Sequence, residues 1–502
     1  MTIIYLFLRS KFTHWKRVGL PYVEPVIPFG NSKGLGTKYH VSEFLVNMYS
    51  QLKSKGPICG VYMYMRAIAL VTDLNLVKTI LIKDFNNFSN RGNYFNEKDD
   101  PLSAHLFNIE DEQWKSLRSK LTPTFTSGKL KIMFSTVMGV SDKLVTAIDN
   151  DITDSSQIEI KDTLSRYTID VIGTVAFGLE CNSLTDKNAE FYRMGLKSFE
   201  GVNFLRRFFL TTFKNLAKKL HFKNIPTDIS NFYMSAVRET VEHRENNPDV
   251  VRNDFMNLLI EMKNSKGENS LTFNQIAAQA FIFFLAGFET TSTAMTYCMY
   301  ELSLNEELQE KARQSVKDAI VKHGSLNYEA VADLRFLEQC LNGEKYNKNC
   351  DRMSYHLTHL SIESLRKYPP AATLLRIAKK DYPVPNTKLI LPKDSVVFIP
   401  VYAIHWDPAI YPKPEIFDPE RFSPSQEAKR HPYAFIPFGE GPRICIAMRF
   451  ALMETKIGLA KLLLNYKFTL DKTKTSVPMK ISSVRAVLTP AEGIYLNLIK
   501  IN

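Results

Sequence analysis

The stretch Phe438-Gly439-Glu440-Gly441-Pro442-Arg443-Ile444-Cys445 directly precedes an apolar segment with helical spacing. Its two glycines allow positive φ and a close approach of the backbone to a bulky ligand. Because a segment with helical spacing follows it, Cys445 is expected near a helix N-terminus. Free N–H groups and the helix dipole lower the pKa of a thiol there. A thiolate suits iron, Arg443 offers a cation to an anionic group of the same ligand, and Phe438 can cover the sulfur. The stretch predicts a thiolate-ligated metal site.

One cysteine alone is more often a small buried hydrophobe than a ligand. The ordered set Phe-x-x-Gly-x-Arg-x-Cys, however, resembles the haem-binding loop of the cytochrome P-450 monooxygenases. This resemblance implies a haem b cofactor with Cys445 as the axial thiolate ligand of its iron and with Phe438 and Arg443 in contact with it. The sequence departs from the family pattern at Ala447, where the family usually has glycine.

A long apolar segment, residues 271–300, predicts a buried central helix that contains Ala286-Gly287-Phe288-Glu289-Thr290-Thr291. A mid-helix glycine costs about 1 kcal/mol relative to alanine, which a flat ligand close to the backbone would offset. The Thr290 hydroxyl can bond to the carbonyl of Ala286 and open a groove. Alternatively, the glycine serves packing and the threonine only its own helix. The resemblance implies that Ala286 contacts the haem and that Glu289 and Thr290 deliver protons to bound dioxygen.

Other charged residues are expected around the haem or in the core. Trp114 and Arg118 share a helix face and both suit a carboxylate. The resemblance assigns them, together with Arg376, to the haem propionates, and the alternative is that each arginine lies on the surface. The motif Glu363-x-x-Arg366, with Arg421 as a third member, resembles the buried charge network of the family, whose role is folding and haem retention.

Composition indicates one large domain. The chain has 502 residues, 45% hydrophobic content and no evident linker. Its six cysteines lack the spacing of a disulfide framework, which fits a reducing compartment. A net charge of +12 allows contact with acidic lipids or an acidic protein partner, but the basic residues form no stripe with interleaved aromatics, so a nucleic-acid partner is not expected.

The first residues suggest a membrane anchor that is truncated. Residues 2–8 are apolar and a basic flank follows, but a spanning helix needs about 20 apolar residues. Residues 1–20 are therefore interpreted as a truncated N-terminal anchor with its basic flank, on the cytoplasmic side, and the alternative is a frayed terminus. Residues 21–502 then form a single haem-thiolate catalytic domain.

One segment interrupts a helical pattern. If residues 343–362 are removed, Leu334, Leu337 and Leu341 continue to Leu365 at helical spacing, and the usual family motif Asn-Glu-x-Leu-Arg is restored. The segment is interpreted as an aberrant insertion, such as a retained intron or gene-model error, and the alternative is a real surface loop.

Most of the chain outside this segment has helical periodicity, and short strands are expected near residues 60–72 and 380–402, with a hairpin over residues 484–501. The fold class is mainly α with small β-sheets (α+β). The resemblance, which covers the chain from Pro21 onward, implies the cytochrome P-450 fold: a triangular helical body with the haem between the long central helix and the cysteine loop. The segments 94–103, 121–128 and 401–405 are similar to those of insect microsomal, xenobiotic-metabolising members.

The resemblance implies an unspecific haem-thiolate monooxygenase on the cytoplasmic face of the endoplasmic reticulum membrane. It would insert one oxygen atom from O2 into xenobiotics, plant toxins, insecticides or endogenous hormones and lipids. Electrons would come from NADPH through cytochrome P-450 reductase, with cytochrome b5 as a further candidate donor. The alternatives are a haem-thiolate isomerase or dehydratase, or a haem-binding product impaired by the insertion. Pocket walls are expected from residues 101–112, 199–213, the central helix, 371–375 and 484–490.

Overall fold

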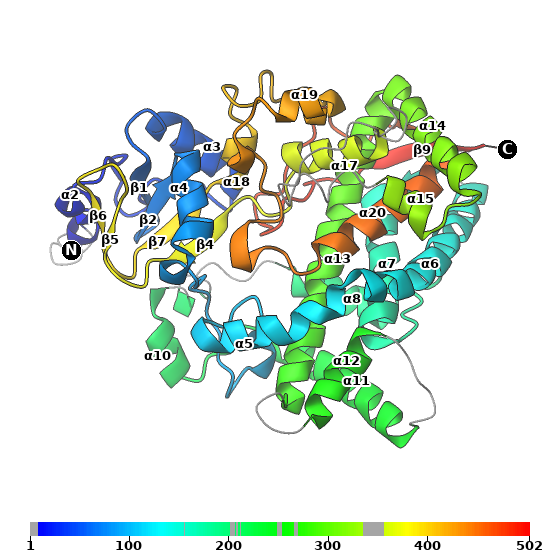
Figure 1. Cartoon of the computed structure of the whole chain (residues 1–502), viewed down its shortest axis with the longest axis horizontal. Coiled ribbons are helices and arrows are strands. Elements are labelled where there is room, and N and C mark those ends of the chain that lie inside the picture. The colour runs from blue at the N-terminus through cyan, green and yellow to red at the C-terminus, as the bar shows by residue number, and fades with distance from the viewer. Residues whose placement is uncertain are drawn as a thin grey trace.

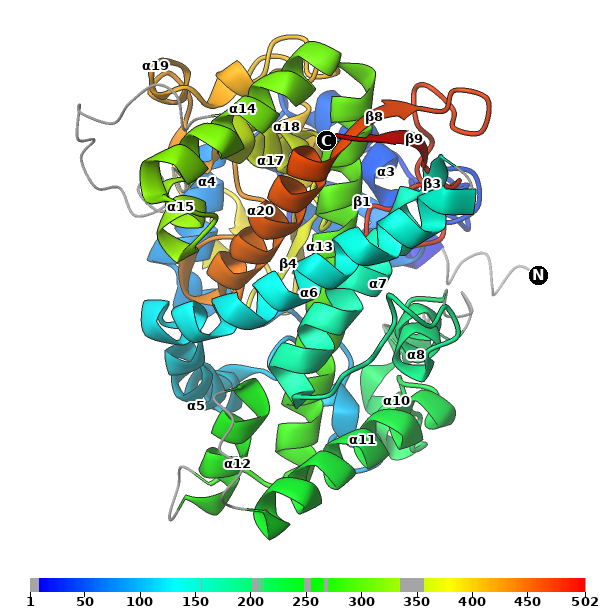
Figure 2. The ribbon, with the colours of Figure 1, turned by 90° about the vertical axis from the view of Figure 1, so that its right-hand side faces the viewer.

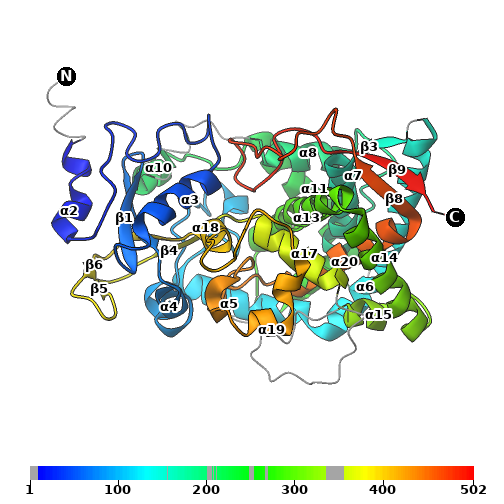
Figure 3. The ribbon, with the colours of Figure 1, turned by 90° about the horizontal axis from the view of Figure 1, so that it is seen from above.

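The computed structural model describes residues 9–154, 156–200, 206, 209, 210, 212–247, 254–265, 270–334 and 356–501. In these residues a helical region lies beside a smaller region built around a sheet, and each has its own hydrophobic core (Figures 1 and 3). The outline in Figure 1 is broad where the sheets lie and narrows toward α11 (Thr227–Asn246) and α12 (Phe255–Asn264). The mainly α fold with small sheets is confirmed.

The larger sheet has the strand order β1-β2-β7-β4. Its strands consist mainly of β-branched and aliphatic residues, and the two central strands, β2 and β7, are almost wholly buried. Strands β1 and β2 are antiparallel, β2 and β7 are parallel, and β7 and β4 are antiparallel. The bounds are β1 Ile58–Met63, β2 Arg66–Val71, β4 Leu374–Ile377 and β7 Val396–Ile399; the separate pair β5 and β6 covers Tyr382–Pro383 and Ile390–Leu391.

The central helix α13 (Phe273–Leu304) runs through the helical region (Figure 2). A capping box fixes its start, because the Thr272 side chain accepts from the backbone of Gln275 and Gln275 accepts from Thr272. Its flanks are covered mainly by α7 (Ile160–Ile172) and α20 (Met448–Asn465). The remaining helices are α2 His14–Val18, α3 Val41–Leu52, α4 Leu74–Lys78, α5 Asp111–Leu121, α6 Ser127–Asp154, α8 Glu190–Ser198, α10 Lys214–Lys219, α14 Glu306–His323, α15 Tyr328–Asp333, α17 His356–Lys367, α18 Val401–His405 and α19 Pro424–Glu427.

The expected hairpin over residues 484–501 is wrong. Its second half forms β9 (Tyr495–Lys500), but this strand pairs with β8 (Tyr466–Leu470) and β3 (Gln157–Glu159). Residues 484–490 form no strand, and Pro490 makes only an isolated bridge to Ile481. Pro490 and Gly493 indicate a turn between neighbouring residues. Strand β9, whose alternate residues are buried, instead pairs with β8 and β3, which are distant in the sequence.

The predicted charge network is confirmed: Glu363 and Arg366 are fully buried, and the Arg421 side chain is 10% exposed. Two parallel hydrogen bonds of 2.8 and 2.7 Å join the Arg366 guanidinium to the Glu363 carboxylate. Arg421 Nε lies 3.5 Å from the same carboxylate, and the backbone N–H of Asp418 donates to it. The network ties α17 to the 3-10 turn Pro419–Phe422 (η8) that leads toward the cysteine loop.

Residues 343–355 of the predicted insertion lie outside the described residues, whereas 356–362 belong to α17 together with Glu363. The aberrant insertion stays a prediction.

The basic flank of the predicted anchor packs against the sheet. Trp15 in α2 is fully buried, and its indole N–H donates to the carbonyl of Val61 in β1 over 3.1 Å. Among the described residues, no helix combines the length and the hydropathy that a bilayer span requires.

Candidate haem site

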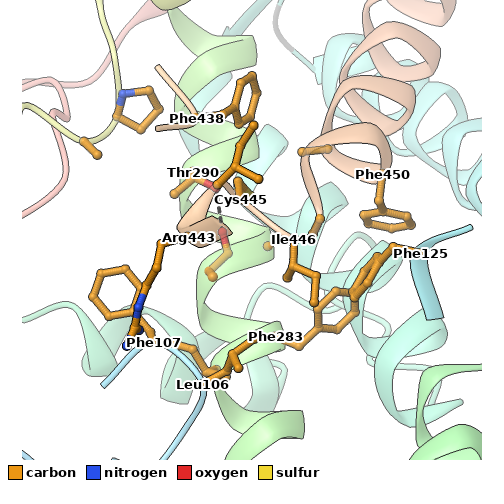
Figure 4. A pocket seen from close by; sticks show the side chains of 18 of the residues that line it. Leu106, Phe107, Phe125, Phe283, Thr290, Phe438, Arg443, Cys445, Ile446 and Phe450 are labelled. Atoms are coloured by element: carbon orange, nitrogen blue, oxygen red, sulfur yellow. Dashed lines mark hydrogen bonds between the residues drawn. The ribbon is translucent and has the colours of Figure 1, made fainter. Parts of the chain in front are cut away.

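The loop before α20 places Cys445 at the wall of a cavity of about 320 Å³ (Figure 4). Gly439 and Gly441 have φ of 75° and 71°, which favours glycine at both positions. Gly441 is also required by packing, since a Cβ there would collide with the carbonyl oxygen of Leu81. The N–H of Cys445 donates to the carbonyl of Phe438 over 3.0 Å and closes the loop beneath the sulfur.

Opposing influences act on the Cys445 thiol. Burial raises its pKa, and the N–H of Ala447 and the charges of Arg118 and Arg91 lower it. A bound metal cation favours the thiolate, since coordination deprotonates a thiol. The site is thus suited to form its thiolate together with its metal.

Ala447 is compatible with the backbone at its position. Its φ of −97° and ψ of 15° lie outside the left-handed region, so the replacement of the usual glycine introduces no backbone strain. Ala447 is one of the residues that line the cavity.

Helix α13 forms the opposite wall of the cavity through Ala286, Gly287 and Thr290. The Thr290 hydroxyl donates to the carbonyl of Ala286 over 2.6 Å, as predicted, and faces the same cavity as Cys445 (Figure 4). The surroundings of Gly287 agree with the packing alternative. A Cβ there would lie 2.5 Å from Cδ1 of Ile172 in α7, so the glycine is required by helix–helix packing.

Glu289 lies away from the cavity. Its side chain is 6% exposed, and its Oε2 is 3.3 Å from Nζ of Lys161 in α7. The same ammonium group donates to the hydroxyl of Ser292 over 2.7 Å. Of the two residues expected to deliver protons, the structure therefore brings only Thr290 to the cavity, while Glu289 is held by an ion pair on another face of α13.

Four guanidinium groups face the cavity, and no Asp or Glu of the described chain lines it; the four are Arg91, Arg118, Arg376 and Arg443. Burial lowers the pKa of Arg376 to about 10 and, with the charge of Arg376, that of Arg443 to about 9. Nε of Arg376 and Nη1 of Arg443 are buried without a hydrogen-bond partner. Buried cations require paired anions, so the cluster fits a ligand with carboxylates, such as the propionates of haem.

The predicted residues Trp114, Arg118, Arg376 and Arg443 are brought together at this cluster. The Arg443 guanidinium lies 4.1 Å from the centre of the Trp114 ring, and its Nε and Nη2 donate to the carbonyls of Ser89 and Ile109. Trp114 thus supports Arg443 as well as lining the cavity.

Sequence reasoning missed Arg91. Its guanidinium lies 4.1 Å from the centre of the Phe107 ring and donates to the Phe107 carbonyl over 3.0 Å. Burial and the charges of Arg376 and Arg443 lower its pKa well below the ordinary value. Arg91 lies in a loop without periodicity, and the only signal is its position before Gly92, which has a φ of 68°.

The rest of the cavity wall is apolar and aromatic. Phe125, Phe283 and Phe450 form a cluster with ring centres 5.5 and 6.0 Å apart (Figure 4). The expected walls from residues 101–112, α13 and 371–375 are present through Leu106, Phe107, Ala371 and Leu374, whereas residues 484–490 and the described part of 199–213 do not line the cavity. Phe284 and Phe288 of α13 do not line the cavity; they are core residues that pack on other rings.

The family model described as "Cytochrome P450" matches residues 20–343 and 348–498. The chain belongs to the cytochrome P450 family. It is 42% identical to Cytochrome P450 6A1 of Musca domestica over 98% of this chain and 94% of that protein. It is 41% identical to Probable cytochrome P450 6a14 of Drosophila melanogaster over 97% of this chain and 95% of that protein. It is likewise 41% identical to Cytochrome P450 6a8 of the same fly, over 99% and 97%.

Family membership makes this protein a haem-thiolate monooxygenase, an oxidoreductase whose haem iron has a cysteine thiolate ligand. The cavity fits this cofactor in two respects: it combines a cysteine sulfur with a cluster of unpaired cations, and its remaining surface is largely apolar. Among the cysteines that the structure describes, Cys59, Cys181 and Cys298 are buried elsewhere and only Cys445 lines the cavity.

Proposed function

We propose that this P450 uses NADPH electrons, delivered by cytochrome P-450 reductase, to insert one oxygen atom from O2 into lipophilic small molecules. The observation that carries the proposal is the apolar, aromatic cavity that Cys445 and Thr290 face from opposite walls. Such a cavity favours apolar substrates through burial of their surface. Xenobiotics, plant toxins, insecticides, hormones and lipids all belong to this class.

Cys445 would ligate the iron, and Arg91, Arg118, Arg376 and Arg443 would hold the propionates. Ala286 and Phe438 would contact the haem from the two walls, and Trp114 would hold Arg443 in place. When bound, the haem supplies the oxygen-activating chemistry, which electron density from the thiolate promotes. These assignments agree with the position of each residue at the cavity.

Thr290 would hold a proton close to the reacting oxygen. Its hydroxyl hydrogen is used by the Ala286 carbonyl, so its oxygen keeps lone pairs that can accept from water in the cavity. Glu289 would exchange protons with bulk solvent, which requires that its carboxylate leave Lys161 by rotation of its side chain. The pair would thus act in sequence rather than side by side.

The proposed partners are the reductase and, as a second donor, cytochrome b5. Helices α5 and α6 carry exposed cations, among them Lys115 and Lys131, whose side chains are 73% and 61% exposed. Together with the net charge of +12, these cations favour an acidic protein partner near Cys445 and an acidic membrane surface. The proposed location is the cytoplasmic face of the endoplasmic reticulum membrane.

A carbon monoxide difference spectrum of the reduced protein tests the ligand. Wild type should show the absorption of thiolate-ligated haem, and Cys445→Ser should lose it. Retention of an unchanged spectrum by Cys445→Ser would refute the assignment. NADPH consumption with added reductase and a lipophilic substrate then tests the monooxygenase activity, since an isomerase or dehydratase would turn over without NADPH.

A further inference from the structure

A second pocket, of about 770 Å³, lies between α8, α11 and the end of the π-helical turn η5 (Gly173–Phe177). It shares no lining residue with the haem cavity. Figure 2 shows α8 and α11 on the part of the molecule away from α14 and the small C-terminal sheet. We call this second pocket the α8–α11 pocket. Its size is that of a pocket for a small organic molecule.

The inner wall of this pocket is aromatic. The ring centres of Phe177 and Phe191 are 5.7 Å apart and those of Phe191 and Phe232 are 4.9 Å apart, with interplanar angles of 65° and 71°. Adjacent rings are therefore close to perpendicular and form the sides of a corner. The edge of one ring meets the face of the next, so together the rings form a continuous apolar, aromatic wall of the pocket.

The rim of the pocket is acidic. Glu190 opens α8, while Asp228 and Glu239 lie on one face of α11. Asp228 is paired with Lys197, and the Arg244 of the lining is paired through two 2.6 Å bonds with Asp254. Glu190 and Glu239 form no ion pair with any described residue. Two uncompensated carboxylates thus flank an aromatic corner in a protein whose net charge is +12.

We infer that the α8–α11 pocket is a second binding site, for small organic cations that join an ammonium group to an apolar body. The rings would contact the apolar body, and Glu190 and Glu239 would supply the charge opposite to that of the ammonium group. The haem cavity, with its four guanidinium groups, disfavours the same ligand. The inference goes beyond the proposed reaction and does not depend on it.

One helix, α13, connects the walls of the two pockets. Phe284 of α13 packs on Phe177 and Phe191, with ring centres 6.0 and 5.6 Å apart, and the preceding residue Phe283 lines the haem cavity. Helix α13 therefore packs with Phe284 against the aromatic wall of the α8–α11 pocket and lines the haem cavity with Phe283.

Calorimetric titration with benzyltrimethylammonium tests the inference on the full-length protein. A quaternary ammonium cannot ligate iron, and competition with imidazole, which occupies the haem site, shows whether it binds there. We expect a dissociation constant below about 1 mM, which corresponds to roughly 4 kcal/mol. The double variant Glu190→Gln/Glu239→Gln should weaken binding about five- to tenfold, because it removes both charges and keeps the size of both side chains.

The matched control is Glu242→Gln, since Glu242 is exposed on α11 but outside the pocket lining. It should leave the affinity within about twofold, because its carboxylate is not at the site. Phe232→Leu should also weaken binding, although it leaves Glu190 and Glu239 in place. Saturating imidazole, an iron ligand, should not compete. Equal affinities of the double variant and wild type, no binding at 1 mM, or full competition by imidazole would overturn the inference.

Discussion

Replacement of Arg366 by methionine tests the buried charge network. Arg366 and Glu363 are both 0% exposed, so the variant leaves a carboxylate in the core with Arg421 and one backbone N–H as its remaining partners. Loss of one partner of a buried pair costs about 3–5 kcal/mol. The unfolding entropy of a chain of 502 residues is about 1 kcal/mol per kelvin, so the melting temperature should fall by about 3–5 °C.

The matched control is Lys115→Met, which breaks the exposed pair of Lys115 with Glu112 at the same i, i+3 spacing. Because exposed pairs contribute about 0–1 kcal/mol, its melting temperature should stay within about 1 °C of wild type. Thermal unfolding followed by circular dichroism at fixed scan rate measures both. Equal melting temperatures of Arg366→Met and Lys115→Met would refute the reasoning.

The same variant should show a distinct pH dependence. Burial raises the pKa of Glu363, and Arg366 is the main opposing influence. Without Arg366 this pKa rises further above its unfolded value, so the folded state gains a proton that the unfolded state lacks. The stability from that proton is present at low pH and is lost as pH rises through the folded pKa. The gap to wild type should therefore be smaller at pH 5 than at pH 7, and a constant gap would contradict this account.

Four further outcomes are expected. Arg376→Leu should speed haem transfer to excess apomyoglobin about 10- to 100-fold, because it removes a charge-assisted contact with the haem propionates. The control Arg193→Leu, at an exposed arginine, should leave the transfer rate unchanged. Thr290→Ala should lower the ratio of product to NADPH consumed about tenfold or more while Thr290→Ser keeps it; equal coupling in both would exclude a role for the hydroxyl. Gly287→Ala should cost about 1–3 kcal/mol of stability by its collision with Ile172, and Ile172→Val should restore part of it in the double variant. Burial lowers the pKa of His405 to about 3, so proton uptake by this residue in the unfolded state should remove about 2 kcal/mol of stability between pH 7 and pH 5. His405→Asn should lose about that much less than wild type over this range in urea titrations.

Local patterns in the sequence predicted the parts of the site that depend on spacing along one helix. The Thr290–Ala286 bond and the Glu363–Arg366 pair both follow from i, i+4 or i, i+3 geometry. Arg421 and the convergence of Trp114, Arg118 and Arg376 required the family resemblance, because these residues come from separate elements. Arg91 was not predicted because it lies in a loop, where no sequence period indicates the direction of a side chain.

Other features depend on neighbours that are distant in the sequence, which local patterns do not report. The pairing of β9 with β8 was invisible to a turn signal at Pro490. The reason for Gly287 is Ile172 on another helix, and the ion pair of Glu289 is with Lys161 on that same helix, α7.

The parallel contact of β2 with β7 sets a time constraint on biosynthesis. β2 ends at Val71, and its partner begins at Val396. At a synthesis rate of about 5–20 residues per second, the ribosome needs roughly 15–65 s to deliver the missing strand. Until then the nascent β1–β2 hairpin carries an open, aliphatic edge, which is a template for intermolecular pairing. Chaperones that shield this hairpin during translation should therefore govern the yield of the protein in a heterologous host.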